Sequence, residues 1–319
     1  MRMRLVASAL VPIALSMATF DRLLAQEYPN KDINIVVGYS AGSGPDLVAR
    51  YFAEAIRERS GKNVIVDNRP GALTNIAVQR VAKSKPDGYT VLITSGNSSW
   101  AINGAIFKEL PFDPINDFTP VTSLITTPFA IAVAEGSKLQ SIADLTSFLK
   151  SKNGLAKYGY PNSISFACAE LYKHVAGVVA TAVPYKSILD THSALSNGEI
   201  DFFVTDLTFR KGKLLSLTTQ QRSSVAVGVP SAQEEGLSDF DLFAWFGVWV
   251  PKNTPADVVE KLTEWVSKSV KTQKTKDYFS KLGMEPWVDV SGEKLREFTR
   301  AEMVKWKKVA DIAKIPAPQ

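Results

Sequence analysis

A glycine-rich turn contains the residues whose types and spacing are best suited to ligand chemistry. It runs from Gly38 to Asp46 (GYSAGSGPD), between an apolar run at Ile33–Val37 and a stretch with helical spacing. Glycine allows backbone N–H groups to approach a ligand closely, and a helix start offers unpaired N–H groups and a partial positive charge. The turn therefore predicts a site for a carboxylate or a phosphate. The alternative is a tight turn in which Asp46 only caps the helix.

A dinucleotide-binding fingerprint is the sharpest rival interpretation of this turn. Gly42 and Gly44 open a helix, and Asp67 ends the next strand, about where a ribose-binding acid would stand. The imitation is incomplete, because Leu47 occupies the third glycine position and Pro45 intrudes. An exported chain would also have little access to NAD. The pattern therefore disfavours a nucleotide cofactor.

Catalytic and metal chemistry find little support. His174 and His192 lie in helical stretches without an acid and a nucleophile at a recognisable spacing. Cys168 is the single cysteine and lies within an apolar helix, which is typical of a small buried hydrophobe. The sequence shows no zinc-ligand spacing, no EF-hand loop and no P-loop. We therefore expect no enzyme activity, no metal and no cofactor.

The N-terminus has the layout of a secretory signal peptide. Arg2 and Arg4 precede an apolar run from Leu5 to Ala18, and Asp21 and Arg22 follow soon afterwards. The run is shorter than the ~20 apolar residues that a membrane helix needs. We therefore expect residues 1–25 to be cleaved and the mature protein to be periplasmic.

Composition indicates an ordinary soluble globular protein with room for two domains. The chain has 319 residues, of which 45% are hydrophobic and 22% charged. Its net charge is +5, but lysines and arginines are scattered without a run of five. Such a distribution is typical of a solvated surface, and it argues against a nucleic-acid partner.

Two alternations of strand and helix patterns predict two α/β lobes. In the first, a helix at 47–56 connects strands at 33–37 and 64–66, and a further strand follows at 90–94. Such a βαβ order places the strands parallel in one sheet. The proline-rich segment Leu110–Asp117 reads as a surface connection.

The second alternation predicts a second lobe. It has helices at 142–150 and 165–176, with strands near Lys157 and at 200–204. The apolar runs Val121–Val133 and Phe240–Val250 read as buried strands at the two crossings between lobes, and amphipathic helices follow Pro255. We therefore expect a discontinuous lobe 1 (26–127 and 249–319), lobe 2 at 128–248, and a hinge near Thr126–Phe129 and Trp245–Val248.

Several motifs in fixed order resemble the Bug family (Bordetella uptake gene type) of substrate-binding proteins for tripartite tricarboxylate transporters. The resemblance extends from Tyr28 to Ile312 and includes YPNKDINIVV from Tyr28, DNRPGA from Asp67, PDGYT from Pro86, LPFDPINDFTPV from Leu110, VPYK from Val183 and WFGVWVPKNTP from Trp245.

The resemblance implies a type II periplasmic binding fold, in which two α/β lobes close over a small organic acid. It also implies delivery of that acid to membrane transporter subunits by a monomeric receptor. Strand carboxyl ends are where open α/β sheets bind ligands. The implied ligand-binding residues are Tyr39, Ser40, Ala41, Gly42, Ser43, Asp46, Ser95, Asn97, Ser98, Trp100, Tyr160, Asn162, Ser163, Ser165, Tyr185, Lys186 and Asp206. Two other roles remain open for such a scaffold, a ligand sensor for a membrane histidine kinase and an exported enzyme.

Departures from the family pattern concentrate at the implied cleft. Tyr160, Ile188 and Leu189 replace small residues, Trp100 lies beside the Ser95–Ser99 stretch, and 207–211 looks shortened. If these apolar side chains line the cleft, each ~100 Å² of ligand surface buried against them contributes ~2.5 kcal/mol. This predicts a preference for an acid with an aromatic or apolar body over a citrate-like one.

Overall fold

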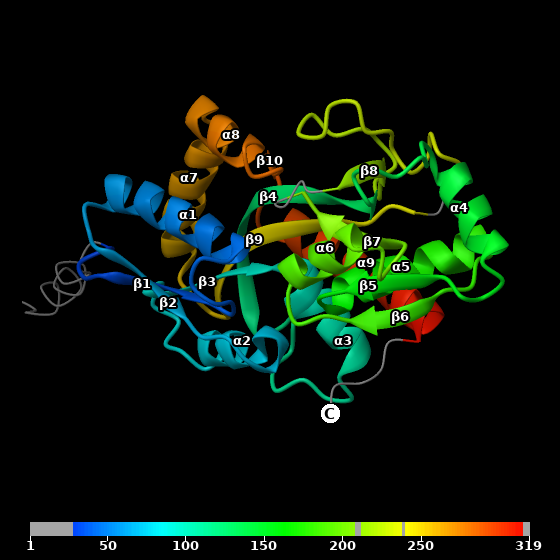
Figure 1. Cartoon of the computed structure of the whole chain (residues 1–319). Helices are drawn as coiled ribbons and strands as arrows, with labels where there is room; N and C mark the ends of the chain where they lie inside the picture. The colour runs from blue at the N-terminus through cyan, green and yellow to red at the C-terminus, as the bar shows by residue number, and fades with distance from the viewer. Residues whose placement is uncertain (1–27, 208–211, 238–239, 315–319) are drawn as a thin grey trace, which may run out of the picture.

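The computed structural model describes residues 28–207, 212–237 and 240–314 (Figure 1). The predicted signal peptide lies outside these residues.

Paired strands follow the order β2-β1-β3-β9-β4-β7-β5-β6, with β8 and β10 also paired to β4. The strands are β1 (Ile33–Val37), β2 (Val64–Asn68), β3 (Thr90–Ser95), β4 (Phe118–Val133), β5 (Lys157–Tyr160), β6 (Thr181–Pro184), β7 (Phe202–Asp206), β8 (Lys213–Leu217), β9 (Phe243–Pro251) and β10 (Glu285–Pro286). The helices are α1 (Gly44–Ser60), a short turn η1 (Ala72–Thr74), α2 (Asn75–Ala82), a π-helical segment η2 (Asn97–Ile102), α3 (Asn103–Ile106), α4 (Ile142–Ser151), α5 (Ser163–Ala176), α6 (Ile188–Ser196), α7 (Ala256–Val270), α8 (Gln273–Ser280) and α9 (Glu293–Ala313).

Lobe 1 contains the βαβ unit that the sequence predicts. β1 pairs in parallel with β2 and with β3, so that Ile33 lies opposite Val64 and Asn34 opposite Thr90. The connecting helix α1 buries Phe52 and Ile56, which have the helical spacing noted in the sequence. The helix ends at Ser60. The next residue, Gly61, has a φ of +65°, which is the left-handed conformation common after a helix C-terminus. The predicted parallel arrangement is confirmed.

Strand β4 takes part in the strand pairing of both lobes. Its first part pairs antiparallel with β9 as far as Pro128, which lies opposite Phe243. From Phe129 onward it pairs with β7 and β8 instead, and Phe129 lies opposite Asp206. The predicted buried crossing strand is confirmed, and so is the irregular connection at Leu110–Asp117 that precedes it.

Lobe 2 is a second α/β unit, on the right of Figure 1. β5 pairs in parallel with β6 and β7, and α4, α5 and α6 belong to the same lobe. The sequence predicts α4, α5, β5 and β7 within a few residues. It misses β6 and β8, which are short and lack a long apolar run, and it notes α6 only as a helical stretch around His192.

The C-terminal helices do not all return to one lobe. α7 packs on α1 and β4, as expected for a helix that completes lobe 1. α9 instead contacts η2 and α3 in lobe 1 and α5 in lobe 2, and Trp306 in its middle is fully buried. α9 is therefore a third link between the lobes, alongside β4 and the segment that leads into β9. No helix within the described ranges is both long enough and apolar enough to cross a membrane.

Candidate functional site

The turn after β1 is organised by a buried carboxylate. Asp46 is 1% exposed, and its Oδ2 accepts hydrogen bonds from the Gly42 amide at 2.8 Å and from Arg50 Nε at 2.9 Å. Its Oδ1 accepts a third from Asn68 Nδ2 at 2.8 Å, and the same amide group donates to the Tyr39 carbonyl at 3.0 Å. Burial opposes ionisation of Asp46, but these hydrogen bonds outweigh it and hold its pKa below the ordinary value. Asp46 thus fixes the shape of the turn.

The outer side of this turn is open. Ala41 and Gly42 are exposed, and a side chain at Gly42 would meet no atom within 4 Å. The Ser43 amide donates to the Ser40 carbonyl at 3.2 Å, whereas no hydrogen bond among the described residues uses the amides of Ser40 or Ala41. Ser43 is the N-cap residue of α1, and its side chain makes no capping hydrogen bond. The turn therefore presents two unpaired amides beside a helix start, an arrangement that suits an anion.

Tyr39 connects the turn to a group of hydroxyls at the end of β3. Its ring is half-buried, and its hydroxyl oxygen is inaccessible to solvent, without a hydrogen-bond partner among the described residues. Burial raises the pKa of Tyr39, and the nearby hydroxyls of Ser98, Ser95, Thr94 and Ser99 partly oppose this. The Tyr39 ring therefore contributes to the surface of the turn while its hydroxyl points into lobe 1.

The residues at and after the end of β3 divide into a group beside Tyr39 and a group buried within lobe 1. Ser95 is buried and Ser98 half-buried, next to Tyr39. Asn97 is fully buried, donates to the Phe243 carbonyl at 2.8 Å and accepts from the Trp245 amide at 2.9 Å, so it joins η2 to β9. Trp100 is also fully buried. Its ring packs in the core of lobe 1, against Phe112, Phe118 and Trp249. The side chain of Trp100 therefore does not contribute apolar surface to a cleft in this conformation.

The expected lobe 2 loop lies at the start of α5. Asn162 caps the helix by accepting a hydrogen bond from the Ser165 amide at 2.9 Å. Ser165 is 5% exposed, and Ser163 begins the helix. The Tyr160 ring packs against Tyr158 and Phe166 and is only half-buried, so part of the residue is accessible to solvent.

The remaining predicted residues follow β6 and β7. The Tyr185 amide donates to the Tyr160 carbonyl at 3.0 Å, which holds the two loops together. Lys186 is exposed, and Asp206 at the end of β7 is half-buried. Leu189 is 51% exposed, whereas Ile188 is partly buried against Leu195 and Phe203. The segment 208–211, which includes Arg210, lies outside the described residues.

Within each lobe, most of the predicted residues lie at or just after the ends of neighbouring strands. Tyr39–Ser43 and Ser95–Ser98 follow the neighbouring parallel strands β1 and β3 of lobe 1. Tyr160, Tyr185 and Asp206 follow or end the neighbouring parallel strands β5, β6 and β7 of lobe 2. These are carboxyl ends, where open α/β sheets place ligands.

Two residues that the sequence reasoning missed contact the turn after β1 in lobe 1. Asn68 binds Asp46 and the Tyr39 carbonyl, and it lies within the DNRPGA motif that carried the resemblance. Thr74 contacts the turn at Gly38, where an added β-carbon would lie 2.7 Å from the Thr74 Cβ. No sequence pattern singled out Thr74, because its position depends on an unusual backbone conformation.

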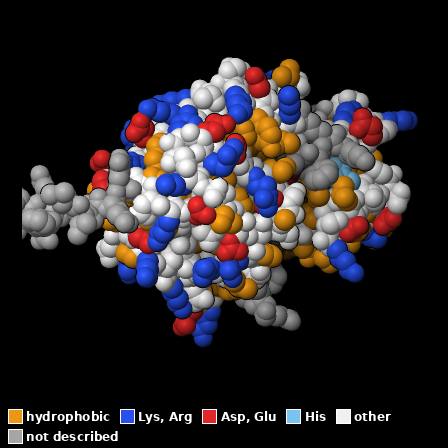
Figure 2. Space-filling model, turned by 90° about the vertical axis from the view of Figure 1, so that its left-hand side faces the viewer, with side chains coloured by type: hydrophobic (Ala, Val, Ile, Leu, Met, Phe, Trp, Pro, Cys, Tyr) orange, Lys and Arg blue, Asp and Glu red, His pale blue; other side chains and the backbone are white. Residues whose placement is uncertain are grey.

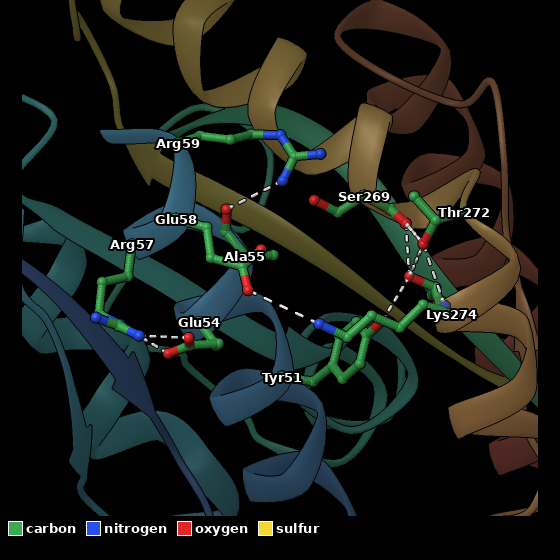
Figure 3. Close-up of polar contacts among 10 residues, drawn as sticks. Tyr51, Glu54, Ala55, Arg57, Glu58, Arg59, Ser269, Thr272 and Lys274 are labelled. Atoms are coloured by element: carbon green, nitrogen blue, oxygen red, sulfur yellow. Dashed lines mark hydrogen bonds and ion pairs between the residues drawn. The ribbon is translucent and has the colours of Figure 1, made fainter. Parts of the chain in front are cut away.

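A groove of ~300 Å³ between α1, α7 and α8 offers a weaker alternative site (Figure 3). The Tyr51 hydroxyl lies 2.8 Å from Thr275 Oγ1, which also hydrogen-bonds Thr272 at 2.9 Å. At its rim, Lys274 pairs with Glu58 at 3.7 Å. Because these polar groups bind one another, the groove has little unmet hydrogen-bonding capacity to recognise a ligand.

On the face shown in Figure 2 and among the described ranges, neither a charged patch nor a metal-ligand cluster marks another binding site. Basic and acidic side chains are interspersed over the lobe 1 face in Figure 2, without a large area of one sign. Within the described ranges, no group of three or more His, Cys, Asp or Glu side chains could hold a metal ion.

The chain is similar to known proteins over most of its length. A model of the tripartite tricarboxylate transporter family receptor matches residues 48–315. A UPF0065 protein of Agrobacterium vitis is 31% identical over 269 residues, which cover 81% of this chain and 77% of that protein. Protein BugT of Bordetella pertussis is 26% identical over 291 residues, covering 88% and 89% of the two chains.

Two solved structures have the same fold. Rpa4515 of R. palustris, determined with adipate, superposes with a TM-score of 0.81 at 29% identity and covers 91% of this chain and 99% of that chain. MatC of Rhodopseudomonas palustris, determined with bound malate, gives a TM-score of 0.74 at 25% identity over 88% of this chain and 99% of that chain. The chain therefore belongs to the tripartite tricarboxylate transporter receptor family, and its relatives include the Bug proteins that its motifs resemble.

Proposed function

We propose that this protein is a periplasmic receptor that binds a small organic acid between its two lobes and delivers it to a tripartite membrane transporter. The turn at Tyr39–Ser43 carries this proposal, because it presents unpaired amides on its open side and is held in shape by the buried Asp46 carboxylate. Backbone donors at a helix start suit a carboxylate. The related structures determined with adipate and with malate support this class of ligand.

The proposed contacts come from both lobes. In lobe 1, the Ser40 and Ala41 amides bind a carboxylate, and Tyr39, Ser95 and Ser98 line the wall beside it. In lobe 2, the contacts are Tyr160, Asn162, Ser163, Ser165, Tyr185, Lys186 and Asp206. Gly42 and Ser43 shape the turn. Asp46, Asn97 and Trp100 act from behind the surface, because all three are buried and engaged in other contacts.

We also propose that the receptor is monomeric and performs no catalysis. Cys168 is fully buried, and burial raises the pKa of its thiol far above the ordinary range, so a thiolate nucleophile is disfavoured. The ring of His192 packs edge-on against Phe203 within lobe 2. Neither residue is placed for acid–base or nucleophilic chemistry in the cleft.

The lobes move about the strands that cross between them. We propose lobe 1 at 26–127 and 249–319 and lobe 2 at 128–248, with residues 1–25 removed on export. The change of pairing partner between Pro128 and Phe129 supports the first boundary, and the start of β9 at Phe243 lies near the second.

Calorimetry with adipate, malate, benzoate and citrate tests the ligand class. We expect at least one aliphatic or aromatic acid to bind. At ~100 times its dissociation constant, it should stabilise the protein by ~2.7 kcal/mol and raise the melting temperature by several degrees. The exposed Leu189 and the half-buried Tyr160 favour an acid with an apolar body over citrate. Binding of citrate alone would refute this preference, and no binding of any acid would refute the ligand class.

Gly42→Val tests the turn itself. Gly42 has φ +81° and open space around its missing side chain, so valine strains the backbone and projects into the space proposed for the ligand. We expect a folded protein with at least tenfold weaker acid binding. Gly61→Val is a matched control, since Gly61 has φ +65° and equally open space at the far end of α1. Wild-type affinity in Gly42→Val would refute the assignment of the turn.

A further inference from the structure

A run of left-handed residues lies directly behind the proposed ligand turn. Ala72, Leu73 and Thr74 have φ values of +45°, +50° and +79°, and none of them is glycine. Such a conformation is unfavourable for residues with a β-carbon, and most unusual for a β-branched one such as threonine. Strain of this kind persists only where surrounding contacts impose it, and it concentrates at functional sites.

Asn103 holds this segment by hydrogen bonds on both sides of Thr74. Its Nδ2 donates to the Leu73 carbonyl at 2.6 Å and to Asn75 Oδ1 at 2.8 Å, and Asn103 itself is 1% exposed. The Leu73 side chain gains little from the arrangement, because it remains 45% exposed. Burial of Leu73 therefore does not account for the strain.

Thr74 is the residue that the conformation places. It is 4% exposed, and its Oγ1 hydrogen-bonds Ser99 Oγ at 2.8 Å. Ser99 Oγ in turn lies 2.6 Å from Thr94 Oγ1, so a chain of three hydroxyls joins η1, η2 and the end of β3. The same Thr94 and Ser99 hydroxyls surround the buried Tyr39 hydroxyl.

Thr74 also sets the position of the turn through direct packing. An added β-carbon at Gly38 would lie 2.7 Å from Thr74 Cβ and 3.0 Å from its Cγ2. The Thr74 side chain therefore rests against the backbone immediately before Tyr39. One face of Thr74 contacts the root of the turn, and its hydroxyl binds the group that surrounds the Tyr39 hydroxyl.

We propose that Thr74 is a positioning residue for ligand binding, and that the strained turn Ala72–Thr74 holds it against Gly38 and against Ser99, one of the hydroxyls near the Tyr39 hydroxyl. This inference rests on the proposed function of the Tyr39–Ser43 turn. Thr74 acts through the turn and does not touch the ligand.

Three substitutions separate this role from simple core packing. Thr74→Ser keeps the hydroxyl and the Cβ that lies against Gly38 and loses only Cγ2, so we expect acid affinity within about twofold of wild type. Thr74→Ala loses the hydroxyl as well, and Thr74→Gly also removes the Cβ and relieves the left-handed strain. We expect both to weaken acid binding at least tenfold, and Thr74→Gly to melt within a few degrees of wild type because relief of strain offsets lost packing. Affinity is measured by calorimetry with whichever of adipate, malate, benzoate and citrate the wild-type protein binds.

Hydrogen–deuterium exchange of the ligand-free proteins gives a readout that needs no ligand. We expect peptides covering 38–47 to exchange faster in Thr74→Ala and Thr74→Gly, and at the wild-type rate in Thr74→Ser. A purely structural role would lower the melting temperature without this local change. Wild-type exchange in 38–47 for both Thr74→Ala and Thr74→Gly would overturn the inference, and so would wild-type acid affinity in both. If the wild-type protein binds no acid while exchange changes as expected, the proposed ligand class fails and the positioning role of Thr74 stands.

Discussion

The Asp46 carboxylate lies behind the turn Tyr39–Ser43, where it accepts hydrogen bonds from Gly42, Arg50 and Asn68. The sequence left two roles open for this residue, a helix cap and a part of the ligand site. The structure gives the N-cap position to Ser43 and uses Asp46 to fix the turn from inside. Sequence spacing could not distinguish these roles, because the decisive partner, Asn68, is 22 residues away on β2.

Asp46→Asn should therefore weaken both stability and ligand binding. A hydrogen bond to a charged group contributes ~1.5–3 kcal/mol to stability. We therefore expect the free energy of unfolding of Asp46→Asn to be lower than that of wild type by about this amount at pH 7. The pKa of Asp46 is lowered by folding, so its contribution is present above the unfolded pKa of ~3.9 and is lost as pH falls through the folded value. Urea unfolding at pH 7 and near pH 3 should show a difference between wild type and variant that shrinks in acid.

An exposed carboxylate provides the control for this effect. Asp257 lies in the first turn of α7 and is exposed, so Asp257→Asn should change the free energy of unfolding by less than ~1 kcal/mol at either pH. An equal loss of stability in both variants, or a loss in Asp46→Asn that does not depend on pH, would contradict the role assigned to the Asp46 carboxylate.

Regular elements with a strong period are where the sequence predicts the fold well. β1, α1, β4 and α7 each have either a continuous apolar run or apolar residues at helical spacing, and the structure confirms all four. β6 is missed because it has four residues, none of them buried inside a long apolar segment. In such elements tertiary pairing decides the structure, and local pattern carries little of that information.

Prediction from local sequence is also limited at the candidate site. The turn after β1 could be predicted from glycine and helix-start chemistry, since both act locally. The burial of Trp100 could not, because η2 is a π-helical segment and its side-chain directions differ from those of an α-helix. Thr74 was also beyond prediction, since its left-handed backbone depends on contacts with Asn103, 29 residues further along.

The packing of η2 against β9 can be tested through two glycines. A β-carbon at Gly96 would lie 2.0 Å from the Trp245 ring, whereas one at Gly104 in α3 would meet only the flexible end of Met303 at 3.5 Å. Gly96→Ala should therefore lower the free energy of unfolding by ~1–3 kcal/mol or more, since the buried Trp245 ring must move. Gly104→Ala should be neutral or stabilising by up to ~1 kcal/mol. Thermal and urea melts of the two variants measure the difference, and equal stabilities would contradict the packing described for η2.

At the scale of the whole molecule, three elements join the lobes. β4 carries the chain from lobe 1 into lobe 2, the segment ending at Leu242 leads back to β9 in lobe 1, and α9 packs on η2 and α3 on one side and α5 on the other. Rotation of one lobe on the other must therefore be accommodated where α9 meets α5, in addition to the point near Pro128 where β4 changes its pairing partner. Because helix packing is close and slides only over short distances, this favours a modest closure over a wide one.

Ligand binding should be visible as compaction. Small-angle X-ray scattering with the acid identified by calorimetry should give a smaller radius of gyration than the ligand-free protein, because closing the lobes shortens the molecule across the cleft. An unchanged radius at saturating acid would mean that the lobes do not move.

A polar contact also joins the two lobes. Glu285 on β10 of lobe 1 accepts hydrogen bonds from Ser223 Oγ, from Ser224 Oγ at 3.2 Å and from the Val225 amide at 3.3 Å, all in the loop that follows β8 of lobe 2. Nearby, an added β-carbon at Gly283 would lie 2.5 Å from Leu207 Cβ, so the two lobes also touch through close packing here. Apolar contact alone tolerates small rotations, whereas three hydrogen bonds to one carboxylate fix the angle.

Glu285→Ala should therefore broaden the range of lobe orientations. We expect a larger radius of gyration for the ligand-free variant than for the ligand-free wild type, because the loop after β8 is no longer held to β10. At saturating acid the two radii should converge, since the ligand then holds the lobes together. Glu264→Ala is the control, because Glu264 is exposed on α7 and pairs only with Lys268 on the same helix. Identical ligand-free scattering of Glu285→Ala and Glu264→Ala would show that the contact between β10 and the loop after β8 does not restrain the lobes, and would leave the three crossing elements as the determinants of their orientation.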